Sequence, residues 1–118
     1  MAHVKSAGQV AIAGGQSLSG PINLGDRILC AVLMPDEWTA AGITVQASDD
    51  HGVTWKDMYD ASGREVEMPA ASASPGQRIS INSSLFSGVD FLRFRSGTGA
   101  LPVAQEADRT LAIISRKL

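Results

Sequence analysis

Glycine and proline interrupt this chain so often that long helices have little room. The sequence has 118 residues, of which 12 are Gly and 5 are Pro. Before the C-terminal segment, the main intervals free of both are residues 26–34, 43–51, 53–62, 77–87 and 89–96. Intervals of this length suit strands better than helices. The sequence therefore predicts short strands joined by turns.

Apolar and polar residues alternate within these intervals, as expected for strands buried on one face. Ile43, Val45 and Ala47 alternate with polar neighbours, and residues 79–82 and 92–95 follow the same period of two. The run over residues 28–34 is apolar without alternation. We expect a second sheet or a neighbouring subunit to cover both of its faces.

Two segments fit the strand pattern less well. Residues 35–42 begin with Pro and two acids and end with Gly, which predicts a single helical turn. Residues 103–118 carry one helical stripe of apolar residues, yet residues 110–114 are rich in β-branched residues. We favour a strand from about Thr110, and the sequence leaves helix and strand open for residues 103–110.

Together these features predict an all-β fold, a β-sandwich or jelly roll of about eight short antiparallel strands. Residues 1–118 are expected to form a single domain. Residues 1–8 show no apolar periodicity. We expect them to form an extended, flexible arm that orders against a neighbour.

Composition excludes several classes of protein. Apolar residues make up 44% and charged residues 19%, which argues against disorder over most of the chain. The net charge of −2 gives no basic stripe, so no nucleic-acid partner is expected. The longest apolar run is far shorter than a membrane span and no secretory signal is evident, so we expect a soluble protein made in a reducing cytoplasm, with no membrane partner. The lone Cys30 cannot form an intramolecular disulfide and is expected to be an inert, buried thiol.

The most specific local motif is the segment from Ser48 to Trp55, Ser-Asp-Asp-His-Gly-Val-Thr-Trp. Its predicted structural residues are Ser48, Asp50, Gly52 and Trp55. The Asp50 carboxylate can accept backbone N–H groups across a turn, Gly52 can take a positive φ, and the Trp55 ring can cover the hairpin. The motif resembles the Asp-box hairpin of sialidase propellers and of discoidin-like carbohydrate-binding sandwiches. That resemblance implies a hairpin and not glycosidase activity.

No catalytic or metal-binding set of residues is evident in the sequence. The acids of residues 49–67 lie beside turns, where carboxylates are normally solvated, and neither an EF-hand nor a pair of catalytic carboxylates is evident. His3 and His51 are far apart and match no metal-ligand spacing with Cys30. Neither a nucleophile elbow nor a phosphate-binding loop occurs. We expect no enzyme activity, no cofactor and no metal.

The candidate interface comprises Ile28, Leu29 and Val32 on the apolar run, and Arg93 and Arg95 on one face of a predicted strand. The two arginines either form salt bridges to nearby acids or present a contact surface to an acidic partner. Trp38, like Trp55, is expected to anchor the fold rather than to bind sugar.

As a whole, residues 26–118 resemble the small β-sandwich decoration, or cement, proteins of tailed-phage capsids. The resemblance rests on short length, Ala-, Gly- and Ser-rich strands, residues 34–41 leading into the hairpin, and the strand over residues 91–97. It implies a structural virion protein on the capsid surface, which binds the major capsid protein and itself, as a dimer or trimer, and stabilises the head.

Two alternatives stay open. The hairpin motif also fits a carbohydrate-binding module of the discoidin-like sandwich type. The same sandwich could serve as a tail or baseplate adaptor.

Overall fold

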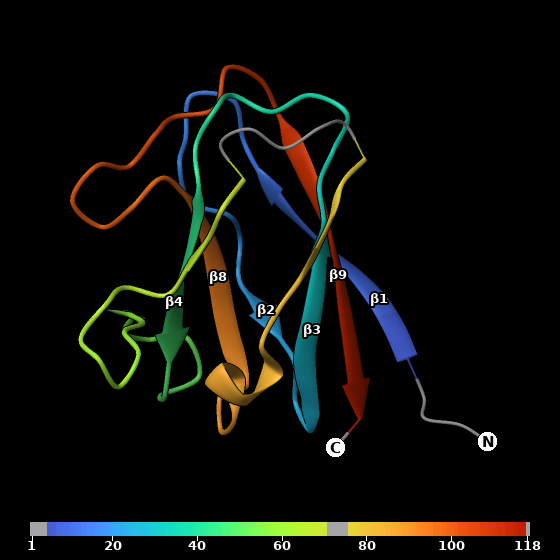
Figure 1. The fold of residues 1–118 in the computed structure, drawn as a ribbon, viewed down its shortest axis with the longest axis vertical. Helices are drawn as coiled ribbons and strands as arrows, with labels where there is room; N and C mark the ends of the chain where they lie inside the picture. Colours follow the sequence, from blue (N-terminus) through green and yellow to red (C-terminus); the bar gives the residue numbers. More distant parts are fainter. Residues whose placement is uncertain (1–4, 71–75, 118) are drawn as a thin grey trace.

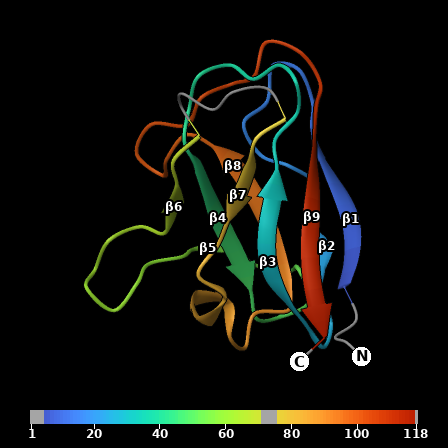
Figure 2. The same ribbon diagram turned by 45° about the vertical axis from the view of Figure 1, so that its right-hand side comes forward.

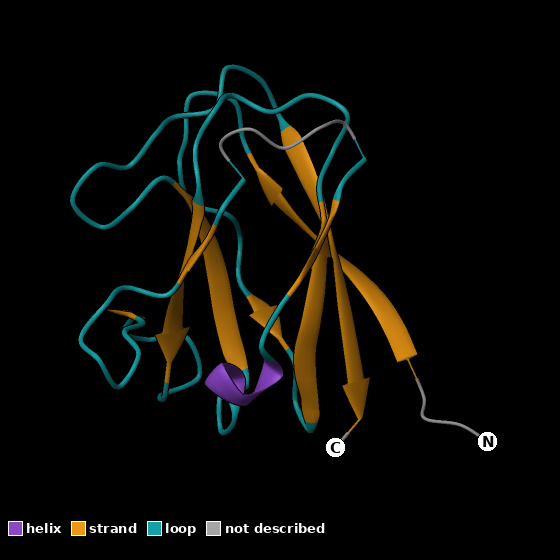
Figure 3. Ribbon diagram, in the orientation of Figure 1, coloured by secondary structure: helices purple, strands orange, loops and turns teal. Residues whose placement is uncertain are grey.

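The computed structural model describes residues 5–70 and 76–117. Within this part the chain forms nine strands and one short 3-10 helix (Figures 1 and 3). The elements are β1 (Lys5–Ile12), β2 (Ile22–Asn23), β3 (Arg27–Leu33), β4 (Ile43–Ser48), β5 (Lys56–Asp57), β6 (Glu67–Met68), β7 (Arg78–Ser80), η1 (Ser83–Phe86), β8 (Phe91–Ser96) and β9 (Arg109–Lys117). No helix among these residues is long and apolar enough to cross a bilayer.

The strands pair like one long hairpin that has been rolled up. β1 pairs with β9, β2 with β8, β3 with β7, and β4 with both β5 and β6, all antiparallel. Lateral pairing of β3 with β9 and of β4 with β8 completes a first sheet, β1-β9-β3-β7, and a second sheet, β2-β8-β4-β5, which Figure 2 shows as two layers. This wrapped pairing is that of a jelly roll. The predicted all-β sandwich is confirmed.

Alternate residues of both sheets fill the core between them. On β4, Ile43 and Val45 are fully buried in the core, whereas the polar Thr44 and Gln46 project from the opposite face. The other core side chains are those of Val10, Ile12, Leu24, Ile28, Leu29, Val32, Met34, Val66, Met68, Ala70, Phe86, Leu92, Phe94, Leu111 and Ile113. The alternation predicted from the sequence is thus the alternation between core and outer face.

A β-bulge explains the apolar run of β3, which does not alternate. The register with β9 shifts between Leu29 and Ala31, so that Cys30 is the extra residue. Cys30 is half-buried and packs against the core as a free thiol. The second sheet covers the core face of β3, so the expectation that both faces of this run would be covered is confirmed for that face.

The interface role expected of Ile28, Leu29 and Val32 is wrong. Their exposed fractions are 5%, 0% and 0% in the single chain. A partner could reach them only by opening the sandwich.

Residues 35–42 form an irregular loop and not the predicted helical turn. Side chains satisfy the backbone of this loop in place of helical hydrogen bonds. The Trp38 indole Nε1 donates to the Ala41 carbonyl oxygen at 2.9 Å, and the Thr39 N–H donates to Gln105 Oε1 at 2.8 Å. Trp38 packs against the core, in agreement with its expected anchoring role.

Two further boundaries differ from the predictions. Residues 103–108 are neither helix nor strand, and β9 begins at Arg109. Residues 83–86 form η1 within an interval predicted to be a strand, because the Asn82 side chain caps the Ser84 N–H.

The expected flexible arm is wrong for residues 5–8, which belong to β1. Lys5 pairs with Arg116 and Gly8 with Ile113 of β9. Backbone pairing of this kind needs no apolar periodicity. Residues 1–4 of the expected arm lie outside the described residues.

Candidate functional site

The segment from Ser48 to Trp55 forms the turn of a hairpin between β4 and β5. Its tip has His51 at φ 60° and Gly52 at φ 86°, and the Val53 N–H donates to the Asp50 carbonyl oxygen at 3.3 Å. Two central residues with positive φ define a type I′ turn, whose twist matches that of the paired strands. Gly52 is needed here for its backbone conformation.

The Asp50 carboxylate ties both sides of this turn together. It accepts the Thr54 N–H at 2.8 Å, the Thr54 hydroxyl at 2.6 Å and the Ser48 hydroxyl at 2.7 Å. These hydrogen bonds, those of Thr54 first, lower the pKa of Asp50 to about 2. Ser48 Oγ also accepts the Gly52 N–H at 2.8 Å. Asp50 therefore makes the cross-turn contact that the sequence predicted.

Trp55 folds back on the outside of the second sheet and does not enter the core. Its ring is half-buried, and the Arg93 guanidinium carbon lies 4.6 Å from the ring centroid. Next to it, the rings of His51 and Phe91 meet edge to face, with centroids 5.4 Å apart. The hairpin tip and β8 thus share a small aromatic surface.

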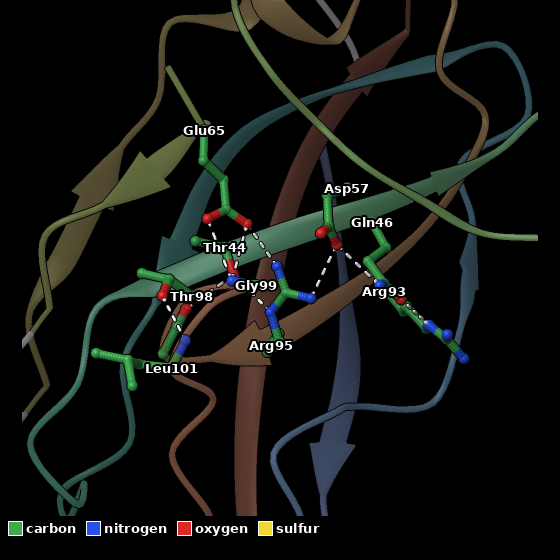
Figure 4. Close-up of polar contacts among 10 residues, drawn as sticks. Thr44, Gln46, Asp57, Glu65, Arg93, Arg95, Thr98, Gly99 and Leu101 are labelled. Carbon is green, nitrogen blue, oxygen red and sulfur yellow. Dashed lines mark hydrogen bonds and ion pairs between the residues drawn. The ribbon is translucent and has the colours of Figure 1, made fainter. Parts of the chain in front are cut away.

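Arg95 lies at the centre of a buried ion network on the same outer face (Figure 4). It is 6% exposed, and its guanidinium donates to Asp57 Oδ1 at 2.9 Å and to Glu65 Oε2 at 2.5 Å. Its Nε donates to Thr44 Oγ1 at 3.0 Å. The two carboxylates compensate a charge that would otherwise be costly to bury.

These contacts decide the role of Arg95. Arg95 forms salt bridges to nearby acids, which was one of the two alternatives predicted from the sequence. The other alternative, a contact with an acidic partner, is wrong for Arg95. The expectation that the acids beside turns are solvated is likewise wrong for Asp57 and Glu65.

Arg93 is held by neutral groups instead. Its Nε donates to Gln46 Oε1 at 2.7 Å, and Gln46 Nε2 donates to Asp57 Oδ1 at 2.9 Å. The bond from Gln46 is the main cause of the lowered pKa of Asp57, and Arg95 adds to it. Burial, and then the charge of Arg95, lower the pKa of Arg93. We call the residues Thr44, Gln46, Trp55, Asp57, Arg93 and Arg95 the β4–β8 face.

Two loops project beside the β4–β8 face, one between β5 and β6 and one after β8; Figures 1 and 2 show both on the same side of the sandwich. Glu65 links them, because its carboxylate also accepts the Gly99 N–H at 3.2 Å. Tyr59 on the first loop is 59% exposed and Leu101 on the second is 75% exposed. Both loops therefore present apolar side chains to solvent from a fixed base.

Sequence reasoning found Arg93, Arg95 and the hairpin but missed the residues that hold the arginines. The available signal was the alternation of β4, which puts Thr44 and Gln46 on the face opposite the core. Register then places Gln46 opposite Arg93. Among the described residues, no group of three or more His, Cys, Asp or Glu side chains could hold a metal ion.

The fold has a counterpart among solved structures. The crystal structure of SPBc2 prophage-derived protein YomS is similar to this chain over 99% of its length and 98% of that chain, with a TM-score of 0.58 and 11% sequence identity. No protein-family model matches the sequence, and no curated protein matches it. At this identity the likeness concerns the fold, which the chain shares over its length with a prophage-derived protein.

Proposed function

We propose that this protein is a structural component of a phage virion, a decoration protein that docks on the outside of an assembled capsid. In this proposal it is made in the host cytoplasm, binds the major capsid protein and carries out no catalytic turnover. The full-length likeness to a prophage-derived protein supports the phage setting. The docking role rests on the surface of the second sheet.

The observation that carries the proposal is a polar surface held by hydrogen bonds and ion pairs, with apolar residues at its margin. Arg95 and Asp57 form an ion pair within the β4–β8 face, and Glu65 ties them to the two loops that expose Tyr59 and Leu101. A surface that is already ordered loses little conformational entropy on binding. Aromatic and Arg side chains, which this face contains, are enriched at protein interfaces.

On a capsid, each single contact needs only a low affinity. Many copies of a protein bound to a repeating lattice are retained through many weak contacts when they also touch one another or bind at more than one point. A small exposed apolar margin around an ordered polar centre suits this situation.

The test is to add purified protein to capsids that lack it and to follow binding by co-sedimentation. We expect the protein to pellet with the capsids, and the double variant Tyr59→Ser with Leu101→Ser to lose most of that binding. Leu85→Ser is the control, because Leu85 is also exposed, at 37%, but lies on η1, outside the two projecting loops. Absence of capsid binding by the wild-type protein contradicts the proposal.

A carbohydrate-binding module is the second candidate, favoured by the aromatic surface of Trp55, Phe91 and His51. Arg93 covers one face of the Trp55 ring, so that this face is not free to stack on a sugar. A glycan-binding screen run beside the co-sedimentation separates the two candidates. Retention on isolated tails instead of capsids would identify the third candidate, a tail or baseplate adaptor.

A further inference from the structure

The terminal nitrogens of Arg93 are hydrogen-bond donors of the β4–β8 face that make no hydrogen bond within the described part of the chain. Arg93 is half-buried, and its Nε is taken by Gln46. Within residues 5–70 and 76–117, neither Nη atom donates a hydrogen bond to the protein, and no carboxylate lies within ion-pair distance. Figure 4 shows this guanidinium pointing away from that of Arg95. Two parallel N–H groups are thus left for a group from outside.

Arg93 and Arg95 differ in the partners that the fold gives them. The two arginines are two residues apart on β8 and share one face, yet Arg95 has two carboxylate partners and Arg93 has none in the described part of the chain. Gln46 supplies a neutral oxygen where a carboxylate would neutralise Arg93. The charge of Arg93 is therefore kept, in a fixed orientation against Trp55.

We infer that Arg93, oriented by Gln46 and Trp55, is a recognition site for the carboxylate of an acidic side chain on the protein to which this chain docks. The inference rests on the proposed function and names the chemistry of its contact. A guanidinium edge binds a carboxylate through two parallel N–H···O bonds. Because Gln46 and Trp55 already hold the side chain, little rotamer freedom is left to lose on binding.

The surroundings favour an acidic side chain with apolar neighbours. Trp55 lies against the guanidinium and offers an apolar contact next to the charged group. Phe91, whose ring meets that of His51, is two residues from Arg93 on β8. A peptide in which Glu is flanked by aliphatic residues fits both features. An acidic sugar would supply the carboxylate, but Arg93 already covers one Trp55 ring face on which it could stack.

The probe is a blocked Leu-Glu-Leu peptide, compared with Leu-Gln-Leu of the same shape, in an NMR titration of the folded protein. We expect the Glu peptide to shift the Trp55 indole and Arg93 Nε signals and to bind about tenfold more tightly than the Gln peptide. Arg93→Gln should abolish the difference. Arg93→Lys should lose most of it, because an ammonium group lacks the planar fork. Arg78→Gln, which removes the same charge from an exposed position on β7, should leave it unchanged.

Equal binding of the two peptides, or full retention by Arg93→Lys, overturns the inference. So does binding of N-acetylneuraminic acid alone, which would assign the site to an acidic glycan. Spectra of each variant establish that it is folded. Co-sedimentation separates this inference from the proposed function. If Arg93→Gln still binds capsids fully, the carboxylate contact is wrong and the docking role stands. If the Glu peptide binds through Arg93 and capsids are not bound, the site stands and the docking role fails.

Discussion

At the scale of single residues, Gln105 ties the loop over residues 35–42 to the segment between β8 and β9. It is 1% exposed. Its Oε1 accepts the Thr39 N–H at 2.8 Å and Arg109 Nε at 3.1 Å, and its Nε2 donates to Thr39 O at 3.0 Å and Ser96 Oγ at 2.7 Å. All buried side-chain polar atoms in the described part of the chain have partners. A buried amide with four contacts is a strong determinant of loop position.

Replacing Gln105 with Leu keeps a similar volume and removes all four side-chain hydrogen bonds. The Thr39 backbone and Ser96 would then be left without these partners, and we expect a loss of about 3 kcal/mol in the free energy of unfolding. Urea denaturation measures the loss. Gln9→Leu is the control, because Gln9 is exposed on β1, and it should change stability by less than about 0.5 kcal/mol. Equal stability of the two variants would contradict the role given to Gln105.

The Asp50 turn predicts a dependence of stability on pH. The folded state lowers the pKa of Asp50 to about 2, mainly through Thr54. A carboxylate whose pKa falls on folding contributes stability that is complete above the unfolded pKa and is lost as pH falls through the folded value. We therefore expect this contribution to disappear between about pH 4 and pH 2. Melting temperatures of the wild type and Asp50→Asn, measured across this range, should converge at the acid end, and a constant gap would contradict the prediction.

At the scale of elements, the Arg95 network holds β8, β5 and the two projecting loops together. Its ion pairs are largely buried, with side-chain exposures of 7% for Arg95, 30% for Asp57 and 16% for Glu65. The pair between Lys117 and Asp26 is exposed, at 61% and 72%. Burial decides which of these ion pairs matters for stability.

Arg95→Met should cost about 3 kcal/mol, because two carboxylates in the partly buried network lose their partner. Lys117→Met, which breaks the exposed pair, should cost less than about 0.5 kcal/mol. Guanidinium denaturation would screen the charges, so urea is the appropriate denaturant. A cost for Arg95→Met no larger than that for Lys117→Met would mean that the network does not anchor the loops.

The elements also show what could be predicted from sequence. β3, β4, β8 and β9 were predictable because each carries enough apolar residues for its pattern to be read. β2, β5 and β6 have two residues each, and their pairing is set by the strands beside them. The irregular loop over residues 35–42 was missed because its hydrogen-bond partner, Gln105, lies more than sixty residues away. The two arginines of the candidate site were predictable, but the groups that hold them were not. Strand pairing brings Gln46 and Asp57 to the arginines, and the loop between β5 and β6 brings Glu65.

At the scale of the whole molecule, the jelly roll buries its apolar strands within one chain. Ile28, Leu29 and Val32 therefore give no support to the homodimer or homotrimer expected from the sequence, and self-association stays a prediction that light scattering can test. We propose that a partner docks on the second sheet, at the β4–β8 face with its two loops and the terminal nitrogens of Arg93.

Hydrogen–deuterium exchange of the protein, free and bound to capsids, tests that placement most directly. Exposed loop amides exchange rapidly in the free protein and slow down when a partner covers them. We predict that binding slows exchange over residues 58–66 and 97–102, and leaves the loop over residues 35–42 unchanged. Slowing confined to residues 35–42 or to the first sheet would contradict the account, and so would an unchanged pattern in protein that is demonstrably bound.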